Sequence, residues 1–311
     1  MLDPTNKQIL DELAALGAPP IHQMAPSDAR HGDLLLAAAC QGDTPQEHVG
    51  RVEDRTIPGP ATEIPIRIYT PKAGSPCGAL VFFHGGGWVV GSIEGHDEVC
   101  RRLTNDSGAL VISVGYRLAP EHKFPAGLED SYAATAWVAA NAAALGYPAG
   151  RIVVGGDSAG GNLSAAIALM ARDRGAPRLA FQLLIYPAVS ASLDWPSVKE
   201  FSGYFVATDD MKWFMNHYLR DTSDATNPYA FPINAKDLRG LPPALVITAA
   251  IDPLRDQGEA YAARLREAGV PTAVSRYEGV THAFVNMAPR VEAGRKALKE
   301  AGAAIRAALT R

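Results

Sequence analysis

The sequence has few cysteines, no basic run and no long apolar run. Its three cysteines, Cys40, Cys77 and Cys100, are an odd number without metal-ligand spacing, which argues against a disulfide framework and fits a cytoplasmic protein. No cluster of Lys or Arg accompanies the net charge of -4, so no nucleic-acid partner is expected. The N-terminus lacks the layout of a signal peptide, and apolar runs such as Ala244–Ile251 have strand length. Neither a membrane span nor stable membrane association is therefore expected.

Nucleotide-binding patterns are absent as well. Neither a G-x-G-x-x-G fingerprint nor a P-loop occurs in the chain, which argues against nucleotide-dependent chemistry. With 47% hydrophobic and 20% charged residues, the composition is that of a globular protein and not of a disordered tail. A chain of 311 residues is long enough to bury a core without disulfides or a structural metal.

Short apolar runs alternate with helical stretches along most of the chain. Such an alternation indicates an α/β fold whose mostly parallel sheet is covered by helices on both faces. The expected strands are 79–83, 109–114, 152–154, 181–186, 244–249 and 272–276, and the expected helices are 95–105, 128–144, 159–172 and 257–268. Before them, residues 48–56 and 63–69 alternate polar and apolar side chains around a Pro-Gly-Pro turn, which predicts an antiparallel hairpin.

Two segments do not fit this alternation and predict a helical cap. Asp3 and Pro4 are suited to begin a helix, a second helix is expected over 33–40, and the prolines up to Pro26 interrupt the stretch between them. The interval from Tyr186 to Ala244 is too long for a plain crossover and is rich in aromatic residues. We assign residues 1–45 and 195–219 to the cap, and 46–194 and 220–311 to the catalytic domain.

One motif carries the nucleophile of a hydrolase. Residues 156–160 read Gly-Asp-Ser-Ala-Gly, they follow an apolar strand, and they open a helix. This strand–turn–helix setting is typical of a nucleophile elbow, where small residues allow the strained turn that presents the serine. A glycine-rich turn with a bystander serine is the alternative, and the strand and helix on either side count against it. Ser158 is the predicted nucleophile.

A serine hydroxyl needs a base within hydrogen-bond reach. Only His217 and His282 follow Ser158, and the order nucleophile, acid, histidine is usual in α/β-hydrolases. His217 lies in a helical stretch beside aromatic residues and is expected to pack. His282 follows the last expected strand, at the carboxyl edge of the sheet where open α/β sheets place their sites. His282 is therefore the predicted base.

The acid that orients this histidine should also follow a strand. Asp252 comes directly after the strand that begins at Ala244, so its carboxylate is expected at the same edge of the sheet. Asp256 is the rival, but its position suits a charge near the N-terminus of the next helix. Asp252 is the predicted acid.

The oxyanion of the reaction needs prearranged donors. Residues 84–88 read His-Gly-Gly-Gly-Trp directly after a strand, as in the loop that supplies backbone N–H groups in lipases and esterases. Gly85 and Gly86 are the predicted donors, with the N–H of Ala159 as the third. His84 is expected to hold the loop through hydrogen bonds.

Together these segments resemble the hormone-sensitive-lipase family of esterases, the bacterial family IV carboxylesterases. The matching segments are 84–103, 116–126, 156–163, 252–269 and 279–284. The resemblance implies an α/β-hydrolase fold with an eight-stranded sheet and a helical cap, and no metal or cofactor. It implies the triad Ser158, Asp252 and His282, hydrolysis of esters with short or medium acyl chains, and an assembly that in many members is a homodimer through the last strand. Gln257 and Ala283 depart from residues common in the family, Glu and Gly.

Aromatic residues are the candidates for contact with the ester substrate. The predicted substrate-binding residues are Trp88, Tyr186, Phe205, Trp213 and Phe214. Trp213 and Phe214 share a helical face with Tyr218, and this face either forms an apolar wall for the acyl chain or only packs the cap onto the body.

Other functions on the same scaffold remain open. A lactonase, amidase or aminopeptidase would use the same elbow, because substrate choice depends on the cap and pocket. A non-catalytic ligand-binding protein is a different class, and the complete triad counts against it. A true lipase would need a larger mobile apolar lid, for which the aromatic content of 7% gives no special support.

Overall fold

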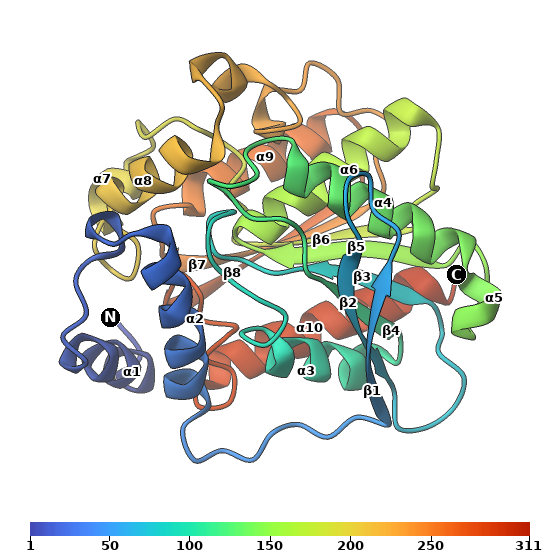
Figure 1. The fold of residues 1–311 in the computed structure, drawn as a ribbon, viewed down its shortest axis with the longest axis horizontal. Helices are drawn as coiled ribbons and strands as arrows, with labels where there is room; N and C mark the ends of the chain where they lie inside the picture. Colours follow the sequence, from blue (N-terminus) through green and yellow to red (C-terminus); the bar gives the residue numbers. More distant parts are fainter.

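The computed structural model describes residues 1–311, built around one eight-stranded sheet in the order β1-β2-β4-β3-β5-β6-β7-β8 (Figure 1). β2 pairs antiparallel with β1 and β4, and all other neighbours are parallel. The strands are β1 (Arg51–Ile57), β2 (Ile64–Thr70), β3 (Ala79–Phe83), β4 (Leu110–Val114), β5 (Ile152–Asp157), β6 (Phe181–Ile185), β7 (Ala244–Ile251) and β8 (Thr272–Thr281). The predicted mostly parallel sheet and its leading hairpin are confirmed.

Helices cover both faces of this sheet. In Figure 1, α3 and α10 lie below the strands, and α4, α6 and α9 lie above them. The bounds are α3 (Asp97–Ser107), α4 (Ala126–Ala140), α5 (Ala142–Leu145), α6 (Ala159–Arg174), α9 (Arg255–Glu267) and α10 (Glu292–Leu309). Because helices cover both faces at the centre of the sheet, the central strands are continuous apolar runs, whereas β1 and β8 at the edges have exposed positions.

Strand β3 shows how alternate residues serve the two cores. Leu80 and Phe82 pack in the core that holds α3 and α10. Val81 and Phe83 pack in the core that holds α4 and α6. Since successive side chains of a strand point to opposite faces, one five-residue strand stabilises both layers of helices.

The N-terminal helices agree with the sequence only in part. α1 (Pro4–Ala15) begins as expected, because the side chain of Asp3 accepts hydrogen bonds from two backbone N–H groups of the first turn. The second helix, α2 (Pro26–Gln41), was expected to begin at residue 33, but it begins seven residues earlier. The sequence suggested a break at Pro26, but this proline occupies the first turn of α2, where its missing N–H costs nothing.

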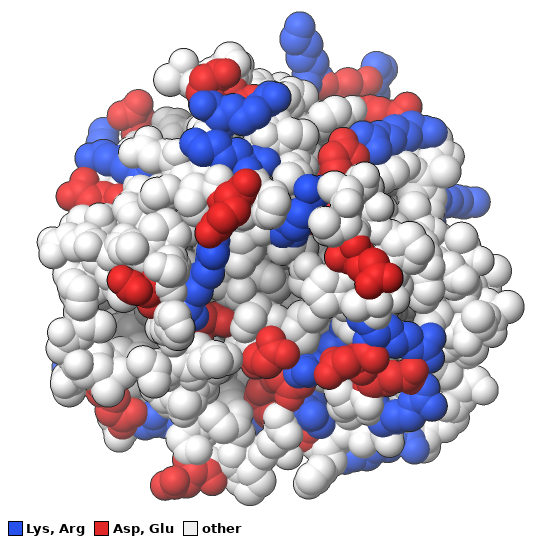
Figure 2. All heavy atoms as spheres, in the orientation of Figure 1, with Lys and Arg blue, Asp and Glu red and all other residues white.

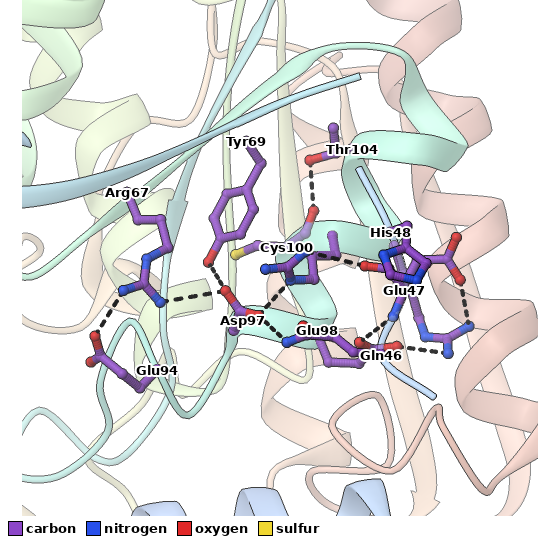
Figure 3. A network of polar contacts seen from close by, with 12 residues as sticks. Gln46, Glu47, His48, Arg67, Tyr69, Glu94, Asp97, Glu98, Cys100 and Thr104 are labelled. Atoms are coloured by element: carbon purple, nitrogen blue, oxygen red, sulfur yellow. Dashed lines mark hydrogen bonds and ion pairs between the residues drawn. The ribbon is translucent and has the colours of Figure 1, made fainter. Parts of the chain in front are cut away.

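A polar network fixes α3 against the hairpin (Figure 3). The carboxylate of Asp97, in the first turn of α3, accepts hydrogen bonds from the Tyr69 hydroxyl (2.8 Å), Arg101 Nε (2.5 Å) and Gln46 Nε2 (2.6 Å). Tyr69 belongs to β2 and Gln46 to the segment before β1. An acidic residue at a helix N-terminus also interacts favourably with the helix dipole, so Asp97 stabilises the helix and its contact with the hairpin together.

The segments assigned to the cap lie side by side. In Figure 1 the beginning of α2 lies near α7 (Pro196–Phe201) and α8 (Thr208–Tyr218), whereas α1 lies beside α2 and farther from both. His22, in the short helix between α1 and α2, contacts Asp210 of α8 through Nδ1 and Oδ1 at 2.7 Å. Arg30 of α2 forms an ion pair with Glu121 of the body at 2.6 Å. These contacts join the N-terminal and inserted segments over one region of the catalytic domain.

The surface has mixed charge on the face drawn in Figure 2. Acidic and basic side chains are interspersed there, and no large area carries one sign alone. None of the helices has the length and apolar character needed to cross a bilayer.

The contact between α3 and α10 yields a stability prediction. A Cβ added at Gly302 of α10 would lie 2.4 Å from the Cβ of Asp106 in α3, so Gly302→Ala must push the helices apart. We expect this variant to lose about 1–3 kcal/mol in the free energy of unfolding, measured by urea denaturation, although alanine favours a helix.

Gly32→Ala is the matched control. Gly32 is also inside a helix, but a Cβ there has no neighbour within 4 Å. This variant should gain up to about 1 kcal/mol from helix propensity alone. Equal stabilisation of both variants would contradict the close helix contact.

Candidate active site

Ser158 lies between strand β5 and helix α6, in a strained backbone conformation. Its φ is 55° and its ψ is -117°, a region that side chains with a Cβ rarely occupy. Its N–H donates a hydrogen bond to the carbonyl of Ile185, at the end of β6, over 2.8 Å. The turn thus projects Ser158 at the carboxyl edge of the sheet.

The two glycines of the motif are required by close packing. A Cβ at Gly160 would lie 1.8 Å from the carbonyl oxygen of Phe83, and one at Gly156 would lie 2.3 Å from the same oxygen. Neither distance can accommodate a side chain. The sequence predicted the need for small residues, and the structure identifies the end of β3 as the neighbour that imposes it.

The structure brings Ser158, His282 and Asp252 together in a chain of hydrogen bonds. Nε2 of His282 lies 2.9 Å from Oγ of Ser158, and Nδ1 lies 2.8 Å from Oδ2 of Asp252. The other oxygen of Asp252 accepts the N–H of Leu254 at 2.8 Å. Asp252 is fully buried and His282 is 4% exposed. A histidine that donates Nδ1–H to the carboxylate keeps Nε2 free to take the serine proton.

The rival residues lie elsewhere. Asp256 is in the first turn of α9, where it accepts a hydrogen bond from the N–H of Ser197 at 2.8 Å and forms an ion pair with Arg255. His217 packs edge-on against Trp213, with ring centroids 4.4 Å apart. Neither side chain contacts Ser158 in this structure.

The loop after β3 places its N–H groups differently from the prediction. The Gly85 N–H, predicted as an oxyanion donor, donates to Oδ1 of Asp157 at 2.9 Å. The N–H groups of Gly86, Gly87 and Ala159 have no acceptor within the protein. Gly85 is therefore corrected to a residue that anchors the loop, because its donor is already used, and Gly87 takes its place beside the nucleophile.

A buried ion pair lies behind this loop. Nε2 of His96 lies 3.2 Å from Oδ1 of Asp157, and both side chains are almost completely buried. Burial by itself would lower the pKa of His96, but the Asp157 carboxylate outweighs it and raises that pKa to about 9. Burial opposes the charge of Asp157 as well, yet the charge of His96 keeps the pKa of Asp157 below its ordinary value. The pair is therefore charged at neutral pH.

The network continues to the loop that carries His282. The side-chain amide of Asn286 contacts both His96, 3.1 Å from Nε2, and the Tyr186 hydroxyl, at 3.3 Å. The Tyr186 ring packs against His282 with centroids 4.6 Å apart. The oxyanion loop, the elbow and the histidine loop are thus joined by one set of buried contacts.

His84 has a structural position, as the sequence suggested. Its ring stacks on Tyr116 with centroids 4.4 Å apart, and its Nδ1 lies 2.8 Å from the carbonyl oxygen of Gly85. Burial and the nearby charge of His96 lower the pKa of His84 to about 4. A neutral ring at this place can hold the loop without adding a second charge beside His96.

Two cavities meet at Ser158 and His282. The larger has a volume of about 520 Å³, within the range of ligand pockets, and is lined by both the cap and the body. The smaller has about 60 Å³. Residues of the larger wall include Ile21, Met24, Leu36, Phe205, Val206 and Phe214; those of the smaller include Trp88, Met211, Met215, Phe231 and Leu254.

The predicted substrate-binding aromatics divide into two groups. Phe205, Phe214 and Trp88 line the cavities. Trp213 lines neither cavity and packs against the apolar cluster of Ala29, Val89, Val90 and Ala119, where α2 meets the body. Tyr186 supports His282 from within the core and lines neither cavity.

Sequence reasoning missed the residues that support the site. His96, Asn286 and Gly87 were not singled out, although each lies within or beside a segment that carries the resemblance. For His96 and Asn286, a polar residue in or beside such a segment with no role in the predicted triad is the signal that could have found them. The structure contains no group of three or more His, Cys, Asp or Glu residues arranged to hold a metal ion.

A Ser–His–Asp chain at the carboxyl edge of a mixed eight-stranded sheet defines the α/β-hydrolase class. Residues 80–286 match the family described as the alpha/beta hydrolase fold. The chain belongs to this family, in the branch related to hormone-sensitive lipase that its motifs indicated.

Relatives and solved structures agree with this placement. The chain is 44% identical over 265 residues to carboxylesterase NlhH of Mycobacterium tuberculosis, covering 83% of each chain. It is 44% identical over 253 residues to an arylesterase of Saccharolobus solfataricus, covering 81% of each. A hyperthermophilic esterase from Pyrobaculum calidifontis superposes with a TM-score of 0.93 at 48% identity, covering 100% of this chain and 99% of the other.

The His96–Asp157 pair predicts how stability depends on pH. The pKa of His96 rises from 6.5 to about 9 on folding, so the folded state binds this proton more tightly than the unfolded chain. The resulting stabilisation is fully present below the unfolded pKa and is lost as pH rises through about 9. We expect the free energy of unfolding, from urea titrations, to fall over this interval.

His96→Gln tests the assignment to this residue. The variant should be less stable than the wild type by about 3 kcal/mol near neutral pH, because it leaves Asp157 buried without its ion pair. It should also show a smaller fall in stability toward alkaline pH. If the free energy of unfolding of His96→Gln fell with rising pH as much as that of the wild type, the fall would be due to groups other than His96.

Proposed function

We propose that this protein is a serine carboxylesterase in which Ser158 is the nucleophile, His282 the general base and Asp252 the acid that orients it. The observation that carries the proposal is the continuous hydrogen-bond chain from Ser158 Oγ through His282 to the buried Asp252. The printed activities of the relatives, a carboxylesterase, an arylesterase and an esterase, support the ester as substrate.

The proposed reaction proceeds in two halves. Oγ of Ser158 attacks the ester carbonyl carbon while Nε2 of His282 takes the hydroxyl proton, and the carbonyl oxygen becomes an oxyanion. The tetrahedral intermediate collapses, the bond to the alcohol oxygen breaks, and His282 gives its proton to the leaving alcohol. Water then attacks the acyl-serine with His282 again as base, which releases the acid and restores Ser158.

We assign the oxyanion hole to the N–H groups of Gly86, Gly87 and Ala159. All three lack an acceptor in the protein, and Gly86 and Gly87 line the cavity beside Ser158. Donors that are already aligned cost no reorganisation when the negative charge develops. The Gly85 N–H instead fixes this loop to Asp157.

The two cavities support small esters as substrates. The two groups on either side of the scissile bond would occupy the cavities that meet at Ser158, one of about 520 Å³ and one of about 60 Å³. The smaller cavity, lined by Trp88, Met211 and Phe231, suits the smaller of the two groups. The larger, walled by Phe205 and Phe214, suits a short or medium chain.

Assembly and location stay proposals. β8 forms an edge of the sheet, and we propose a homodimer that extends the sheet through the part of this strand before Gly279, where the contacts of α1 begin. Cys40, Cys77 and Cys100 are all free thiols, which fits the cytoplasmic location proposed from the sequence.

Hydrolysis of p-nitrophenyl esters of increasing chain length tests the activity. We expect turnover to be highest for acyl chains of about four to eight carbons and to fall for longer chains that exceed the cavity. Ser158→Ala should lower kcat by at least about 10⁴-fold, because no other hydroxyl replaces the nucleophile.

Ser131→Ala is the matched control for the loss of a buried hydroxyl. Ser131 lies in α4 and donates to the carbonyl of Gly127 at 2.7 Å, away from the cavities. This variant should keep the wild-type rate. A folded wild type that is inert over the whole ester series would contradict the proposal and direct the search to amides, lactones or ligand binding without catalysis.

A further inference from the structure

We propose that Asn6, in the first helix, is a positioning residue for His282. The proposal rests on the role of His282 as general base proposed above. It concerns a residue at the opposite end of the chain from the histidine loop, in a segment that the sequence suggested was only part of the cap.

Asn6 is held against the residue that precedes His282. Its Oδ1 accepts the backbone N–H of Thr281 at 2.8 Å, across 275 positions of sequence. Its Nδ2 donates to the Met287 sulfur at 3.0 Å and to Thr281 Oγ1 at 3.3 Å. Asn6, Thr281 and Met287 are all fully buried. A buried amide is stable only when its polar atoms are paired, and here the partners belong to the histidine loop.

The end of β8 needs such a partner. Its pairing with β7 is regular up to Tyr277 and becomes irregular before Thr281, where the register shifts. β8 is also the last strand of the sheet, so no further strand lies on its other side. The amide of Asn6 thus provides the acceptor that a neighbouring strand would otherwise supply for the Thr281 N–H.

The backbone conformation of Ala283, the residue after His282, is a second reason why the position of Thr281 must be fixed. Ala283 has a φ of 66°, a left-handed conformation that is unfavourable for a residue with a Cβ and persists only where the surroundings impose it. With Thr281 fixed on one side, the strain at Ala283 cannot relax by moving His282 away from Ser158. The departure from glycine at this position therefore makes the Asn6 contact more important.

A second contact anchors the same end of α1. The N–H of Asp3 donates to the carbonyl of Gly279 at 2.7 Å. The side chain of Asp3 in turn accepts the N–H groups of Thr5 and Asn6 at 2.9 Å each. The first turn of α1 is therefore fixed to β8 at two points, and Asn6 is the point closer to His282.

Asn6 is separate from substrate binding. Neither Asn6 nor Thr281 lines the cavities that meet at Ser158. A change at Asn6 should thus affect the alignment of His282 and leave the walls that bind the ester in place. This predicts a loss in kcat without a matching rise in KM, since a small misplacement of a catalytic group slows chemistry strongly.

The test uses the full-length enzyme and p-nitrophenyl butyrate. We expect Asn6→Ala to lower kcat by about 10- to 100-fold with KM changed less than about 3-fold. Asn6→Asp keeps an oxygen that can accept the Thr281 N–H, so it should recover kcat to within about 3-fold of the wild type. Equal impairment of the two variants, or a wild-type kcat in Asn6→Ala, would overturn the proposal.

Ile9→Ala is the matched control in the same helix. Ile9 is also fully buried and packs in the core beneath α1, but its side chain makes no hydrogen bond. It should lower the melting temperature at least as much as Asn6→Ala and keep kcat near the wild-type value below that temperature. A loss of kcat in Ile9→Ala as large as in Asn6→Ala would show that α1 acts only through stability and would overturn the proposal.

Two additions keep the result interpretable. If Asn6→Ala does not fold, Asn6→Ser takes its place in the test, because it leaves a polar space that water can fill. The expected loss of kcat is the same for both variants. Stoichiometric release of p-nitrophenol from a p-nitrophenyl phosphonate measures the reactivity of Ser158 without ester turnover. A wild type that reacts with the phosphonate but hydrolyses no ester would refute the proposed function, and the Asn6 series would then be judged on phosphonylation rates.

Discussion

The close approach of β3 to the nucleophile turn is the constraint on which the site depends. The Phe83 carbonyl oxygen lies where a Cβ on Gly156 or Gly160 would be, so the turn can form only with glycine at both places. Because the oxyanion loop begins directly after Phe83, the same contact fixes the distance between the loop and Ser158. One packing requirement between two parallel strands thus places the proposed nucleophile and the N–H groups proposed to stabilise the oxyanion.

The sequence was sufficient for the features that depend on local pattern and chain order. The strands and the elbow follow from apolar runs and from small residues around Ser158, and the sheet they form was found as expected. The choice of Asp252 over Asp256 followed from position alone, since a residue that ends a strand and one that begins a helix point to different places. Such inferences need no knowledge of side-chain contacts.

The sequence was insufficient where a side chain from elsewhere decides the outcome. Gly85 and Gly87 cannot be told apart from the sequence, because both are glycines of the same motif. Only the hydrogen bond from Gly85 to the Asp157 carboxylate shows which backbone N–H is already used. Trp213 and Phe214 are adjacent in α8 and therefore about 100° apart around its axis, so the broad apolar face that contains both could not show that only Phe214 reaches the cavity. The Asn6–Thr281 contact joins distant parts of the chain, and no local periodicity reports it.

These contacts show that the body carries the reacting groups and that the cap forms much of the cavity wall, but the two roles are not fully separate. The proposed triad follows the carboxyl ends of β5, β7 and β8, whereas much of the cavity wall comes from α2, α8 and the segments beside them. Such an arrangement lets the wall change while the reacting groups stay in place. The first turn of α1 departs from this separation, because its contacts reach the backbone of β8 rather than the cavity. The N-terminal segment is therefore bound to the catalytic machinery at one end and to the substrate wall at the other, which couples the placement of the cap to the placement of His282.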